Sequence, residues 1–138
     1  MGKETDIALE SRIVGHLASY PGIAAVYVFG SVATGRATAL SDLDVAILFQ
    51  KGSIPDAMRL LGLRERLSTL AGMDVDVVCL NTAPPVLAHQ VLLNGNRIVV
   101  KDVSATNAFF VRTIAEYDDL KRIRRPVEQN VLRGRVHG

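Results

Sequence analysis

Short apolar runs separated by polar and glycine-rich turns dominate this sequence. Three of these runs have the length and the β-branched and aromatic content of strands: residues 25–29, 43–49 and 74–80. A fourth and shorter run, residues 97–100, predicts a strand at a sheet edge. The pattern therefore predicts a small β-sheet.

Apolar residues also recur at helical spacing between and after these runs. Four helices are predicted, over residues 5–19, about 53–70, 84–93, and from Ala105 onward. The resulting order is αββαβαβα. It indicates one α/β (α+β) domain over residues 1–138, in which helices flank a small mixed sheet and the last helix, from about residue 105 to 138, is long.

Polar residues and glycines suggest where the helices begin and end. Ser53 is a candidate N-cap of the second helix, and Gly72 is expected to end it. Asn81 and Thr82 are expected to cap the third helix. Pro126 is expected to end or kink the last one, because proline lacks an amide hydrogen and clashes with the preceding turn.

The overall composition is that of an ordinary globular domain. Of 138 residues, 49% are hydrophobic and 22% are charged, which is enough apolar material for a core. We find no apolar run long enough to span a membrane, and the polar N-terminus lacks the apolar centre of a signal peptide. With Cys79 as its single cysteine, the chain is expected to act in the reducing cytoplasm, away from membranes.

The net charge of +2 is unevenly distributed. Residues 121–138 carry six Lys or Arg and one Glu, so the body of the chain is mildly acidic and its end is basic. A basic end can dock an acidic partner or a nucleic acid. A solvated helix face explains it equally well, and both interpretations stay open.

Two acidic residues, Asp42 and Asp44, open the second strand, and a Gly30–Ser31 turn follows the first. Side chains alternate along a strand, so Asp42 and Asp44 point the same way and repel each other. A divalent cation removes this repulsion, and Mg²⁺ binds through one or two carboxylates plus phosphate oxygens. Backbone N–H groups and the hydroxyl of Gly30–Ser31 can bind that phosphate. The pattern predicts a metal–nucleotide site.

A third carboxylate is available on the next predicted strand. Asp74 and Asp76 share a face there, so only one of them need be a ligand. Asp76 lies inside an apolar run, where an unpaired charge would be costly, which favours a functional role. Asp74 is interpreted as a solvated or supporting residue.

The segment after Gly30 has the glycine spacing of a P-loop. It lacks the lysine and the following Ser or Thr of that motif, so Gly35 is interpreted as a turn glycine. Arg36 either contacts phosphate or is a solvated charge. Ser41 either stabilises the turn at Asp42 or orients a ligand carboxylate.

The remaining candidate groups give weaker signals. No two histidines have the i, i+4 spacing of a zinc site, and Cys79 is expected in the core. Arg97 and Arg112 could approach a nucleotide or a partner, although surface charges are the favoured interpretation.

These motifs together resemble the signature of the nucleotidyltransferase superfamily that includes DNA polymerase β. The similarity rests on Gly30–Ser31, Gly35, the segment 41–44 and Asp76, and the short chain points to the minimal nucleotidyltransferases. Residues 74–87 and 91–95 further resemble the antitoxins of HEPN–MNT toxin–antitoxin systems. About residues 10–120 take part in the resemblance.

The resemblance implies a polymerase β-like nucleotidyltransferase fold and a two-metal reaction. ATP would bind with two Mg²⁺ ions held by Asp42, Asp44 and Asp76, and its β- and γ-phosphates would lie on Gly30–Ser31. Asp76 would help to deprotonate the attacking hydroxyl. The implied acceptor is a tyrosine of a cognate HEPN ribonuclease toxin, which the transferred AMP inactivates within a hetero-oligomeric complex.

Two other functions remain open at this point. The protein could neutralise its partner by occlusion, without catalysis, although the intact carboxylates disfavour a passive binder. It could also transfer nucleotides to a small molecule or to RNA. Direct nucleic-acid binding is not expected, because aromatic residues that could stack on bases are few.

Overall fold

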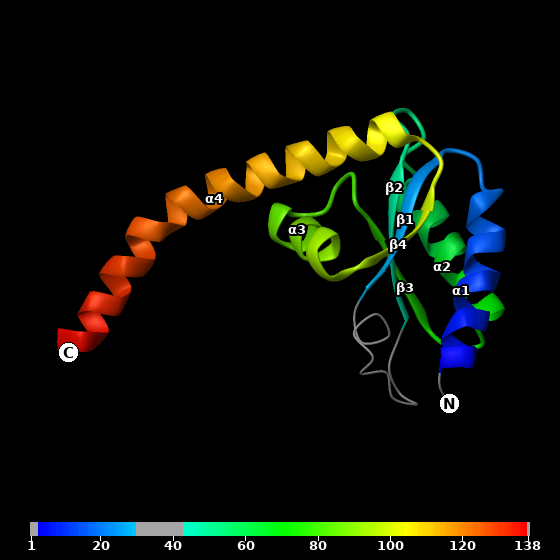
Figure 1. The fold of residues 1–138 in the computed structure, drawn as a ribbon, viewed down its shortest axis with the longest axis horizontal. Coiled ribbons are helices and arrows are strands. Elements are labelled where there is room, and N and C mark those ends of the chain that lie inside the picture. Colours follow the sequence, from blue (N-terminus) through cyan, green and yellow to red (C-terminus); the bar gives the residue numbers. More distant parts are fainter. Residues whose placement is uncertain (1–2, 30–42, 138) are drawn as a thin grey trace.

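The computed structural model describes residues 3–29 and 43–137. Its secondary structure has the predicted order: α1 (Lys3–Ala18), β1 (Ile23–Phe29), β2 (Leu43–Phe49), α2 (Ala57–Ala71), β3 (Val75–Cys79), α3 (Pro85–Asn94), β4 (Asn96–Val100) and α4 (Val103–His137). The strands form one mixed sheet in the order β3-β2-β1-β4 (Figure 1). Only β2 and β3 are parallel, and β4 lies at an edge, as predicted.

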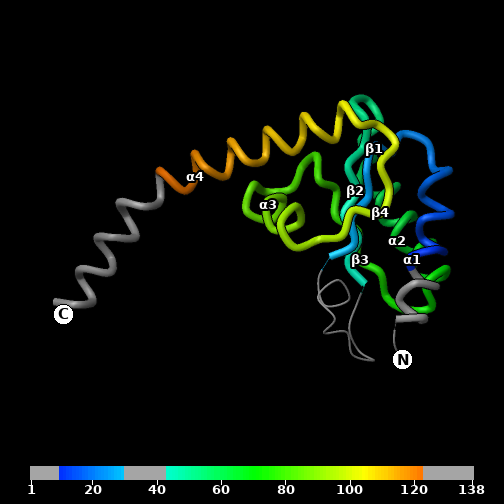
Figure 2. The backbone as a smooth tube through the Cα atoms, in the orientation of Figure 1, coloured from blue at the N-terminus to red at the C-terminus, as the bar shows by residue number. Residues whose placement is uncertain are grey.

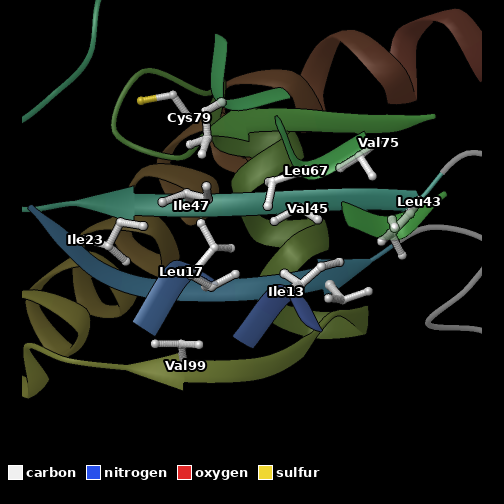
Figure 3. Packing of buried hydrophobic residues seen from close by; sticks show 14 of the residues in the cluster. Ile13, Leu17, Ile23, Leu43, Val45, Ile47, Leu67, Val75, Cys79 and Val99 are labelled. Atoms are coloured by element: carbon white, nitrogen blue, oxygen red, sulfur yellow. The ribbon is translucent and has the colours of Figure 1, made fainter. Parts of the chain in front are cut away.

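Each face of the sheet is covered by one pair of helices. On the first face, Ile13 and Leu17 of α1 and Leu67 of α2 pack on Val45 and Ile47 of the central strand (Figure 3). On the second face, apolar residues of α3 and of the first turns of α4 pack on Ala46 and Leu48 and their neighbours. Strand alternation thus gives β1 and β2 two buried faces, which explains their nearly continuous apolar sequence.

The last helix continues far beyond the sheet. Its N-terminal part packs against the domain, and the helix then projects outward as an arm (Figures 1 and 2). The helix passes through Pro126 to His137, so the prediction that Pro126 ends it is wrong, and its alternative, a kink at Pro126, stays a prediction. The turns on either side continue the helix across the hydrogen bond that proline cannot make. No helix within the described ranges is long and apolar enough to cross a membrane.

Two predicted helix caps are also wrong. The N-cap of α2 is Asp56, whose carboxylate accepts a hydrogen bond from the Arg59 amide at 2.8 Å, and Ser53 lies outside the helix. The residue before α3 is Pro84, so Asn81 and Thr82 do not cap this helix, and it has no side-chain cap. Gly72 does end α2, in the left-handed conformation that glycine adopts without strain.

Asn81 forms hydrogen bonds with the end of β2 instead of capping a helix. Its Oδ1 accepts from the Phe49 amide and its Nδ2 donates to the Phe49 carbonyl, both at 2.9 Å. The Asn81 side chain therefore satisfies both backbone groups of Phe49, which has no pairing partner in β3. Sequence pattern alone could not show this contact between residues 32 positions apart.

Asn81→Ala is expected to lower the free energy of unfolding by about 1–3 kcal/mol, because it leaves the Phe49 N–H and C=O without these partners. Urea denaturation of the wild type and the variant measures this. Asn94→Ala, at the exposed end of α3, is the matched control and should change stability by less than about 0.5 kcal/mol. Equal losses in the two variants would show that the hydrogen bonds between Asn81 and Phe49 contribute nothing to the free energy of unfolding.

Candidate active site

Two of the predicted carboxylates lie side by side on neighbouring strands. Asp44 of β2 and Asp76 of β3 are register partners in the parallel pair, next to the hydrogen bond from the Leu43 amide to the Asp74 carbonyl at 3.0 Å. Asp44 lies two residues before Ala46 on β2 and Asp76 two residues before Val78 on β3, and both of these apolar residues pack toward α3 and α4, so the two carboxylates lie on that face of the sheet. Residues 32 positions apart in the sequence are thereby brought together.

Asp76 is half-exposed, with 45% of its side chain accessible, so the expectation that it lies in apolar surroundings is wrong. Its Oδ1 lies 3.1 Å from Nη2 of Arg64. Arg64 belongs to α2, which packs on the opposite face, so its side chain reaches around the free edge of β3. Because β3 is an edge strand, there is room for this contact. The sequence analysis did not identify Arg64, because no motif near it in the sequence indicates a contact with Asp76.

The two candidates for the third carboxylate differ in position. Asp76 lies within β3, opposite Asp44, whereas Asp74 precedes the strand and is exposed. Only Asp76 therefore has a fixed place beside Asp44.

The other predicted site residues lie outside the described residues. They are Gly30, Ser31, Gly35, Arg36, Ser41 and Asp42. The ends of this segment are nevertheless placed, since Phe29 ends β1, Leu43 begins β2, and Phe29 is the register partner of Asp44. The segment that carries the phosphate motif thus leaves and rejoins the sheet beside Asp44.

The donor set fits a hard divalent cation. Asp44 and Asp76 supply carboxylate oxygens at an edge of the domain that water and phosphate can reach, and Mg²⁺ prefers such ligands. Within the described part of the chain no cluster of three His, Cys, Asp or Glu could hold a metal, and the third predicted ligand, Asp42, belongs to the segment outside it.

The remaining candidate groups have structural roles. Cys79 is buried in the core, as predicted. His89 stacks on Tyr117 with ring centroids 3.7 Å apart, which joins α3 to α4. Arg112 lies over the Phe109 ring and 3.8 Å from Glu116 on the same helix. Arg97 is exposed on β4 and hydrogen-bonds Tyr27.

Comparison with known proteins agrees with this geometry. Residues 11–104 match the family described as polymerase beta, nucleotidyltransferase. The protein adenylyltransferase MntA of Shewanella oneidensis is 29% identical over 124 residues, which are 89% of this chain and 87% of that protein.

Two solved toxin–antitoxin structures have the same fold. A crystal structure of a toxin–antitoxin complex with AMP-PNP contains a chain 29% identical to this one, with a TM-score of 0.77 over 89% of this chain and 98% of that chain. The complex of the tri-AMPylated S. oneidensis HEPN toxin with its MNT antitoxin gives 26% identity and a TM-score of 0.73 over 92% and 98%. The family match, the shared fold and the paired carboxylates lead to one conclusion: the chain belongs to the polymerase beta nucleotidyltransferase family.

Proposed function

We propose that this protein is an antitoxin that transfers AMP from Mg-ATP to a tyrosine hydroxyl of a cognate HEPN ribonuclease toxin and so neutralises it. The observation that carries the proposal is the register of Asp44 and Asp76, beside both ends of the phosphate-motif segment. The relatives support the choice of donor and acceptor, because one is named a protein adenylyltransferase and another is bound to an AMPylated toxin.

The residues divide the reaction between them. Gly30 and Ser31 hold the β- and γ-phosphates, with Arg36 beside them and Ser41 orienting the carboxylates. Asp42, Asp44 and Asp76 would hold two Mg²⁺ ions, which would neutralise phosphate charge and lower the pKa of the acceptor hydroxyl. Asp76 accepts the tyrosine proton, the phenolate oxygen bonds to the α-phosphorus, and the bond to the β-phosphate breaks to release pyrophosphate.

The shape of the chain suits an acceptor that is itself a protein. The long helix α4 projects away from the small sheet domain (Figure 2). An arm of this kind can hold a partner while its tyrosine reaches the carboxylates. The basic end of the arm would then increase the rate of encounter with an acidic partner.

Arg64 is expected to compete with the cation for Asp76. Arg64→Ala should therefore lower the Kd for Mg²⁺ by about two- to fivefold, the modest effect of a half-exposed ion pair. Calorimetric titration of the protein with MgCl₂ measures it. Arg66→Ala, which removes an exposed charge from the same helix, is the control. A weaker Mg²⁺ affinity in Arg64→Ala would show instead that Arg64 holds Asp76 in its ligating position.

Ribonuclease assays separate catalysis from occlusion. The toxin is incubated with the antitoxin, with and without ATP and MgCl₂, and the two are then separated by denaturing chromatography and refolding of the toxin. Transfer predicts that toxin treated with ATP stays inactive after the antitoxin has been removed. Occlusion predicts full recovery in both samples, and that result would contradict the proposal.

A further inference from the structure

An exposed apolar surface on α2 lies next to the ion pair between Arg64 and Asp76. Met58 and Leu61 are large apolar residues of this helix, and they are 76% and 46% exposed. The next residue, Gly62, has no side chain, and the space that its Cβ would occupy is open. We call Met58, Leu61 and Gly62 the α2 patch. It is flat, apolar and accessible to another protein.

The α2 patch continues along the side of the helix that flanks the free edge of β3. Leu61, Arg64 and Ser68 have the spacing i, i+3 and i+7, which places them on one side of α2. Ser68 Oγ accepts a hydrogen bond from the Val75 amide at 2.9 Å, and Arg64 Nη2 lies 3.1 Å from Asp76 Oδ1. Leu61 precedes Arg64 by less than one helical turn, a rise of about 5 Å. The patch therefore begins directly beside the ion pair.

The free edge of β3 is the open side of the candidate active site. Asp44 lies on the inner side of Asp76, and both ends of the phosphate-motif segment, at Phe29 and Leu43, lie beside Asp44. In residues 3–29 and 43–137, no strand lies beyond β3. A hydroxyl that gives its proton to Asp76 can therefore approach from this edge, along α2.

The chemistry of this surface fits an apolar segment that contains an aromatic residue. Met58 has a flexible, polarisable thioether that adapts to the surface of a partner and makes favourable contacts with aromatic rings. Arg64 lies between the patch and Asp76, and a guanidinium can stack on the ring of a tyrosine once a cation has taken its place at the carboxylate.

We infer that the α2 patch docks the segment of the toxin that carries the acceptor tyrosine. Apolar residues beside the tyrosine pack on Met58 and Leu61, and its ring passes Arg64 to bring the hydroxyl to Asp76. The inference rests on the proposed function for the identity of the partner and of its acceptor residue. It adds the surface that presents the tyrosine to the site, which is separate from the arm formed by α4.

Transfer kinetics with varied toxin concentration test the patch. Met58→Gln and Leu61→Gln remove apolar surface but keep residues that favour a helix. Each should raise the KM for the toxin about 5- to 30-fold at saturating ATP and MgCl₂, the range for truncation of an important interface residue. The kcat and the Kd for Mg-ATP should stay within about twofold of the wild type. Leu93→Gln makes the same change on α3, at a residue that is 70% exposed, and should keep the wild-type KM.

Photo-crosslinking tests where the tyrosine segment lies. Met58 is replaced by benzoylphenylalanine, and the protein is irradiated together with the toxin. Peptide mapping should find the cross-link on the toxin peptide that carries the adenylylated tyrosine or on a peptide adjoining it. The same group in place of Leu93 is the control and should not join that peptide.

An unchanged KM in both α2 variants would overturn the inference, as would an equal rise in Leu93→Gln or cross-links only to distant toxin peptides. If the α2 variants instead weakened self-association in sedimentation velocity and left the KM unchanged, the patch would be a contact between copies of this chain and the inference would be wrong. Failure of the proposed function gives a different result: a toxin that is cross-linked from position 58 on a tyrosine-bearing peptide but never adenylylated. Thermal unfolding of each variant verifies that it is folded.

Discussion

Asp44→Asn is expected to lower the rate of AMP transfer by about a thousandfold or more without unfolding the protein. Asparagine keeps the size of the side chain but removes the charge that binds the cation beside the phosphates. Asp42→Ala should have a comparable effect for the same reason. Initial rates of adenylylated toxin formation at saturating MgCl₂ and ATP measure the loss.

Stability provides the control for this result. Asparagine keeps the size and the hydrogen-bonding capacity of the aspartate side chain, so the Asp44→Asn variant of the metal-free protein should still unfold in one cooperative transition. Glu65→Gln, which removes an exposed carboxylate on α2, should leave the transfer rate unchanged. Transfer at the wild-type rate by the double variant Asp42→Ala, Asp44→Ala would show that the site is elsewhere.

The second large effect is expected to distinguish the roles of two nearby carboxylates, Asp76 and Asp74. Asp76→Asn should reduce transfer by about a hundredfold or more, because Asp76 lies opposite Asp44 and accepts the proton of the attacking hydroxyl. Asp74→Asn should change it by no more than about threefold, since Asp74 is exposed and precedes the strand. The same transfer assay compares the two variants. Equal losses, or a larger loss at Asp74, would reverse the assignment.

The sheet could be predicted because its signals are local. Alternation along β2 and β3 and the apolar runs between turns were sufficient to place Asp44 and Asp76 on strands of one small sheet. The order of the elements and the edge position of β4 followed from the same pattern. The metal and phosphate roles of these residues stay predictions.

The parts that could not be predicted depend on contacts between distant segments. Arg64 reaches Asp76 only because β3 is an edge strand, and Asn81 turns to β2 because the pairing of β2 with β3 ends at Ile47, before Phe49. The pairing of β1 with β4 also has an irregular register, since it shifts between Val26 and Tyr27 and sets Arg97 opposite Tyr27. Local propensity contains none of this information.

Intact-mass spectrometry of the toxin tests the central claim most directly. Purified toxin is incubated with this protein, ATP and MgCl₂, and in parallel with Asp44→Asn. The account predicts that the toxin gains the mass of one or more adenylyl groups with the wild-type protein and none with the variant, and that peptide mapping places them on a tyrosine. A toxin of unchanged mass that is nevertheless inhibited would contradict it.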